Sequence, residues 1–76
     1  MKEIGHYKYI LIDNNRNTLQ FLVKGNTNTL MKVELDKESN IIRPLVIDNE
    51  RNHTPRSLPL EVLKGICQFC EEIKEV

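Results

Sequence analysis

The sequence predicts an α+β fold, a four-stranded antiparallel β-meander (ββββα) packed on one face by a C-terminal α-helix. Three observations lead to this prediction. Four runs rich in β-branched and aliphatic residues occupy the first 48 positions, short polar segments separate them, and the last 20 residues repeat apolar side chains at helical spacing. A chain of 76 residues has room for one such core, so we expect a single domain over residues 1–76.

Turn signals separate the predicted strands. The strands are YKYILID (7–13), TLQFLVKG (18–25), TLMKVELD (29–36) and IIRPLVID (41–48). The intervening NNRN, GNTN and KESN segments contain Asn, which tolerates the left-handed backbone of tight turns. Such short connections join neighbouring antiparallel strands, which predicts a meander in sequential order. Pro44 has no amide hydrogen to donate, so we expect the fourth strand at one edge of the sheet and the first strand at the other.

A polar loop and one helix are predicted to complete the chain. NERNHTPRS (49–57) is too polar to pack, and SLPLEVLKGICQFCEEIKEV (57–76) is typical of a helix with Ser57 as its cap and Pro59 in its first turn. Residues spaced by 100° form one apolar arc. The arc consists of Val62, Leu63, Ile66, Phe69, Cys70 and Ile73. Gly65 costs a helix about 1 kcal/mol relative to Ala, so we expect it to mark a close approach to the sheet.

The Cys67–Cys70 pair fits three interpretations. Core packing is the simplest, because Cys70 lies inside the apolar arc and Cys67 at its margin. A zinc site would need both His6 and His53 as the remaining ligands. Redox chemistry would need the first Cys at a helix N-terminus, and Cys67 comes about two turns too late. We therefore expect core packing, with no metal and no cofactor.

Composition and motifs give little support to catalysis, and no enzymatic activity is expected. The chain has no P-loop, dinucleotide-binding glycine pattern, HExxH motif or nucleophile elbow. Eleven basic residues balance eleven acidic ones, so the global basic field of a non-specific nucleic-acid binder is absent. Two cysteines and the lack of a secretory signal indicate a cytoplasmic protein, and no membrane span is predicted.

The loop offers a small candidate site. Arg51, His53 and Arg56 could together meet a phosphate or an acidic patch. The same composition is typical of a soluble connector.

A larger candidate site arises because one helix covers one face of a sheet. The face predicted to receive the helix is formed by Leu19, Phe21, Val23, Met31, Val33 and Leu35. The first predicted strand is apolar on both sides, so either Tyr7, Tyr9 and Leu11 or the alternating Ile10 and Ile12 must face outward. We expect a contiguous outward patch, which commonly marks an interaction site. The predicted partner-binding residues are Tyr7, Tyr9, Leu11, Leu22, Lys24, Leu30, Lys32, Arg43, Arg51 and Arg56.

Two main classes of function fit this surface. In the first, a small non-enzymatic module docks a protein partner or a second copy of itself through the sheet face or the edge strand, as a regulator, inhibitor or adaptor of the size found in phage or mobile-element accessory proteins. In the second, Tyr7 and Tyr9 stack on a single-stranded nucleic acid while basic side chains hold phosphates. The aromatic content of 5% and the neutral charge favour the first. A small zinc-binding protein is a further alternative.

Overall fold

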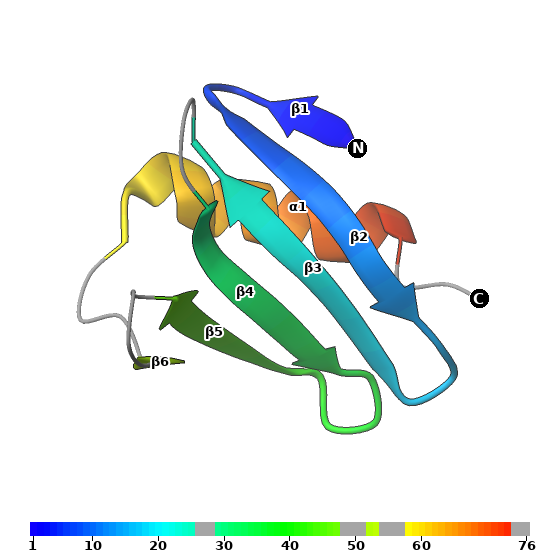
Figure 1. The fold of residues 1–76 in the computed structure, drawn as a ribbon. Coiled ribbons are helices and arrows are strands. Elements are labelled where there is room, and N and C mark those ends of the chain that lie inside the picture. Colours follow the sequence, from blue (N-terminus) through cyan, green and yellow to red (C-terminus); the bar gives the residue numbers. More distant parts are fainter. Residues whose placement is uncertain (26–28, 48–51, 54–57, 74–76) are drawn as a thin grey trace.

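The computed structural model describes residues 1–25, 29–47, 52–53 and 58–73, with the backbone alone at residues 29, 30, 46, 47, 52 and 53. These residues form an antiparallel sheet in sequential order and one helix, which crosses one face of the sheet (Figure 1). The elements are β1 (Lys2–Ile4), β2 (Tyr7–Asn14), β3 (Thr18–Lys24), β4 (Thr29–Asp36), β5 (Ile41–Ile47), β6 (Asn52–His53) and α1 (Leu60–Ile73). The α+β class and the meander are confirmed. None of the described helical segments has the length and apolar character needed to cross a membrane.

The strand count is where the sequence prediction differs from the structure. The four predicted strands are present as β2 to β5, and β1 and β6 are added at the two sides of the sheet. Strands of three and two residues are too short to carry a detectable hydrophobic period. The loop expected over 49–57 is therefore wrong at residues 52–53, and the rest of that segment lies outside the described residues.

Neither predicted edge strand is the outermost strand of the sheet. Strand β1 pairs with Tyr7–Tyr9, and β6 pairs with Val46 and Ile47 of β5. Within the described residues, however, β6 does not extend to Pro44. Pro44 itself therefore lies on a stretch of β5 that is unpaired on its outer side within the described residues, as expected of a residue without an amide hydrogen. Strand β5 as a whole is nevertheless not the outermost strand.

Side chains and left-handed residues build the turns. Gly5 has a φ of 61° at the first central position of the two-residue β1–β2 turn, the pattern of a type II′ hairpin. Asn15 builds the β2–β3 turn through its side chain, since its Oδ1 accepts the N–H groups of Asn17 at 2.8 Å and Thr18 at 2.9 Å. Asn40 adopts a φ of 61° in the β4–β5 turn, as expected of its KESN segment.

Helix α1 begins later than predicted. The carbonyl oxygen of Pro59 accepts the N–H groups of Val62 at 3.0 Å and Leu63 at 3.1 Å, so Pro59 occupies the capping position. Ser57, the predicted cap, lies outside the described residues. The apolar arc is confirmed except at Leu63, which is 46% exposed.

The core lies between α1 and the centre of the sheet. Its buried residues are Tyr9, Leu19, Phe21, Val23, Met31, Val33, Leu35, Val62, Ile66, Phe69 and Cys70. The β3 and β4 residues among them are those predicted to face the helix, and their register aligns Phe21 with Val33 and Leu19 with Leu35. This part of the prediction is confirmed.

Helix α1 runs in the same direction as β2, and polar contacts near each end of the helix hold it against this part of the sheet. Near its start, Glu61 contacts His6, and at its end the carbonyl oxygen of Ile73 accepts a hydrogen bond from Asn14 Nδ2 at 2.8 Å. Between these points a Cβ atom at Gly65 would overlap with the hydroxyl group of Tyr9. Gly65 therefore marks the close approach of helix and sheet that the sequence predicts.

Candidate interaction face of the sheet

The candidate site is the side of the sheet opposite α1, here called the open face. The register places four rows of side chains on it. The basic end contains Lys8 and Lys24, and the apolar row contains Ile10, Leu22, Lys32 and Leu45. The acidic end contains two rows, one of Asp13, Gln20, Glu34 and Arg43 and one of Thr18, Asp36 and the exposed Ile41. In Figure 1 no described element lies in front of this face. The helix therefore leaves the open face uncovered within the described part of the chain.

The two tyrosines do not lie on the open face. Tyr9 is fully buried, with its ring centroid 5.6 Å from that of Phe69 and 6.2 Å from that of Phe21. Tyr7 packs against the same core on the helix side. The expectation that these rings form part of the outward surface is wrong, because Gly65 opens a space on α1 that the Tyr9 ring occupies. Burial also raises the pKa of the Tyr9 hydroxyl.

The remaining predicted site residues are distributed over several places. Leu22, Lys24, Lys32 and Arg43 lie together on the open face, as expected. Leu11 pairs with Phe21 on the helix side and is 44% exposed. Leu30 lies in β4 between paired Met31 and Thr29, with its side chain outside the described atoms. Arg51 and Arg56 lie outside the described residues.

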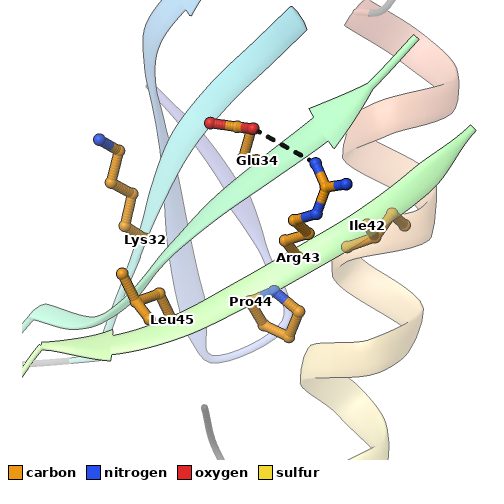
Figure 2. Close-up of a pocket in the computed structure, with 6 residues that line it drawn as sticks. All are labelled: Lys32, Glu34, Ile42, Arg43, Pro44 and Leu45. Carbon is orange, nitrogen blue, oxygen red and sulfur yellow. Dashed lines mark ion pairs between the residues drawn. The ribbon is translucent and has the colours of Figure 1, made fainter. Parts of the chain in front are cut away.

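A depression of about 470 Å³ lies at the β4–β5 side of the sheet (Figure 2). Lys32, Glu34, Ile42, Arg43, Pro44 and Leu45 line it. Figure 2 shows the Arg43 guanidinium group turned toward Glu34 on the neighbouring strand, and the two charges are 3.7 Å apart. Glu34 also accepts a hydrogen bond from Gln20 Nε2 at 3.2 Å. The acidic end is thus an ordered polar network across β3, β4 and β5.

The lysines of the open face have no such network. Lys8 and Lys24 lie directly opposite each other on β2 and β3. Like charges in this position repel each other and destabilise the sheet. Glu3 of β1 lies opposite Lys8 on its other side, but within the described residues no ion pair involves Lys8, Lys24 or Lys32. The basic end therefore presents charge that the described chain leaves unpaired.

The β1–β2 turn forms a second polar cluster on the helix side. Glu61 of α1 accepts the backbone N–H of His6 at 2.5 Å, and its other oxygen lies 3.0 Å from His6 Nδ1. A Cβ atom at Gly5 would overlap with this carboxylate, so glycine is required both by the left-handed φ and by the contact. Lys2 of β1 forms an ion pair with Glu72 near the other end of α1. These contacts attach the first hairpin to the helix.

We expect Glu61→Gln to lower the melting temperature more at pH 5.5 than at pH 8. The hydrogen bond and charge of Glu61 raise the pKa of His6, so this contribution is complete below the ordinary value of 6.5 and is lost as the pH rises through the raised pKa. The amide and ring of His6 lower the pKa of Glu61, so that contribution is present above 4.5 and is lost as the pH falls through the lowered pKa. Between pH 4.5 and 6.5 the contributions of His6 and Glu61 to stability are therefore both present.

Glu72→Gln is the matched control for this measurement. It removes a helix carboxylate whose charged partner is Lys2 and not a histidine. Its effect on the melting temperature should therefore be similar at both pH values. An equal loss for Glu61→Gln at the two pH values would contradict the role given to His6.

The Cys67–Cys70 pair does not join a ligand cluster among the described residues. Cys70 is buried in the core, as expected, whereas Cys67 is exposed, so core packing is wrong for that residue. His6 contacts Glu61, and nine residues of α-helix place Cys70 on the opposite side of α1 from Glu61. No group of three or more potential metal ligands occurs in the described part of the chain, and the side chain of His53 lies outside it.

Known proteins supply no further assignment. Comparisons with protein-family models, curated proteins and solved structures found no match to this chain. The functional argument therefore depends on the geometry of the open face alone.

Sequence reasoning missed Ile10 and Leu45 as residues of the open face. Both are half-buried members of the apolar row, on β2 and β5. Their strands are apolar at almost every position, so alternation could not decide which set faces outward. The contact between Glu61 and His6 was missed for another reason. Only the Gly-His turn between two β-prone segments could have indicated it.

Proposed function

We propose that this chain is a non-enzymatic protein-docking module that binds a protein through the open face of its sheet. The observation that carries the proposal is the apolar row of Ile10, Leu22 and Leu45 on a face that α1 does not cover. Lys32 lies in the same row, between Leu22 and Leu45. An apolar strip with a charged border is typical of protein interfaces, whose centres are apolar and whose rims are polar. A role as regulator, inhibitor or adaptor follows from docking without catalysis.

The position of the aromatic residues favours a protein partner over a nucleic acid. The chain contains two tyrosines, two phenylalanines and no tryptophan. Tyr9, Phe21 and Phe69 are buried and Tyr7 packs against the core, so no aromatic ring is available on the open face for stacking on bases. The acidic end would also repel phosphates, since Glu34 and Asp36 lie on the same face as the lysines.

We expect Leu22→Asp to abolish protein docking while Gln68→Asp leaves it intact. Leu22 is in the apolar row, whereas Gln68 is an exposed residue of α1 on the other side of the molecule. The measurement is the amount of each protein that the immobilised chain captures from a cell extract, wild type against the two variants. Leu22→Thr, which introduces a polar but β-branched side chain that suits a strand, separates lost docking from lost folding if circular dichroism is unchanged.

Two outcomes would overturn the proposal. One is capture of the same proteins in the same amounts by wild type and both Leu22 variants. The other is salt-dependent binding of labelled single-stranded RNA or DNA, titrated at 50 and 200 mM salt, that exceeds any protein binding. A steep fall in affinity between the two salt concentrations is the mark of phosphate contacts.

A further inference from the structure

We propose that the protein bound by the open face is a second copy of this chain, in a face-to-face dimer with two-fold symmetry. This inference rests on the proposed docking function and names its partner. It follows from the order of the rows on the open face. A basic end and an acidic end lie on opposite sides of an apolar row, so the surface is complementary to itself in charge and in polarity.

The charges of the two ends have opposite signs when the described strand residues are counted. At the basic end Lys8, Lys24 and Glu3 sum to one positive charge, and Lys32 lies in the apolar row and belongs to neither end. At the acidic end three carboxylates and one guanidinium group sum to two negative charges. These groups belong to Asp13, Glu34, Asp36 and Arg43. A partner of one sign would match only one of these ends. A second copy in reversed orientation matches both.

The register fixes the symmetry axis. A two-fold axis that lies in the plane of the open face, perpendicular to the strands and along the apolar row, reverses the strand direction of the second copy. It places the basic end of each copy over the acidic end of the other, and it places Ile10, Leu22 and Leu45 over their own counterparts. Lys32 lies in the same row and therefore also meets its counterpart, so its ammonium group must extend away from the axis toward solvent. Both copies then use the same patch, which is the form of an isologous dimer. An axis parallel to the strands would instead place basic end on basic end.

The dimer explains two features that the single chain leaves unexplained. The opposed pair Lys8 and Lys24 has no ion pair within the described residues, and in the dimer it faces the acidic end of the partner copy. The apolar row becomes the centre of an interface between two sheets, which pack about 10 Å apart with nearly aligned strands.

The decisive test is a cross-link on the symmetry axis. In a Cys67→Ser background, which removes the exposed native thiol, Leu22→Cys should form a covalent dimer with a short bismaleimide cross-linker, because Leu22 faces its own counterpart. A linker is needed because two sheets about 10 Å apart are too distant for a direct disulfide. Lys24→Cys in the same background should not, because it faces the acidic end of the partner copy. Equal cross-linking of both variants would overturn the proposed axis.

Charge exchange tests the pairing of the two ends. By sedimentation equilibrium, Lys24→Glu alone and Glu34→Lys alone should each raise the dimer dissociation constant by about tenfold or more, the size of effect seen at well-packed interface positions. An equimolar mixture of the two variants should associate more tightly than either alone, since Lys24→Glu gives one copy two acidic ends and Glu34→Lys removes the net negative charge from the acidic end of the other. No gain on mixing would contradict the inference.

The failure of this inference and the failure of the docking function have different signatures. A wild-type chain that stays monomeric at 100 μM would overturn the dimer, while Leu22-dependent capture of a different protein would still support docking. A dimer that is insensitive to Leu22→Asp would overturn both.

Discussion

Phe69→Ala is expected to remove a large share of the stability of the fold, from about a quarter to all of it. Phe69 is 1% exposed, and its ring centroid lies 4.7 Å from that of Phe21 and 5.6 Å from that of Tyr9. Truncation of a buried Phe costs about 3–5 kcal/mol, from lost apolar burial and the cavity left behind. A domain of this length has about 4–11 kcal/mol to lose, at 0.05–0.15 kcal/mol per residue. Urea denaturation followed by circular dichroism measures the change.

Leu63→Ala is the matched control on the same helix. Leu63 is 46% exposed, so its truncation leaves no cavity, and the change should stay below about 1 kcal/mol. If Phe69→Ala and Leu63→Ala had similar effects, the packing of α1 on the centre of the sheet would be contradicted.

Gly65→Ala should destabilise the protein, although alanine is the better helix former. The substitution gains about 1 kcal/mol in helix propensity. The added Cβ atom would lie 2.6 Å from Cζ of the Tyr9 ring and overlap with its hydroxyl group. Because that ring is fully buried between Phe21 and Phe69, it cannot move without disturbing the core. Overpacking of this kind costs about 3 kcal/mol at the upper end, so we expect a net loss of about 2 kcal/mol.

The chain provides its own control for this substitution. Among the described residues no atom lies within 4 Å of a Cβ placed at Gly25, and its φ is not in the left-handed region, so Gly25→Ala should leave the urea midpoint unchanged or raise it slightly. Adding Tyr9→Phe to Gly65→Ala should recover part of the lost stability by removing the hydroxyl group. A Gly65→Ala variant that is more stable than the wild type would show that α1 does not approach β2 this closely.

Strong alternation is what made part of this fold predictable. In β3 and β4 the buried residues Leu19, Phe21 and Val33 are separated by Gln20, Lys32 and Glu34, so only one face can enter a core. The helix arc has the same property, because charged residues occupy the other side of α1. Where apolar and polar residues alternate in this way, the cost of desolvating charged groups allows only the apolar face to be buried. This is the face that the structure buries.

Strand β2 shows where alternation fails. It is apolar at every position from Tyr9 to Ile12, so burial of either face would satisfy the hydrophobic effect. A register shift between Leu11 and Asp13 leaves Ile12 as an extra residue, and this bulge places Asn14 on the helix side, where it contacts Ile73. No sequence pattern reports such a shift, which is why unbroken alternation would place Ile12 where the structure has Asp13 paired with Gln20.

The amino-acid sequence by itself determined the fold class, the order of the elements and the buried faces of β3, β4 and α1, since these follow from local periodicity. Only the tertiary structure decided which face of β2 is buried, and with it the residues of the open face. That decision depends on contacts between residues far apart in the chain: Tyr9 with Gly65, Asn14 with Ile73 and His6 with Glu61. Such contacts form only when α1 packs on the sheet, and the local sequence around each residue does not indicate its distant partner.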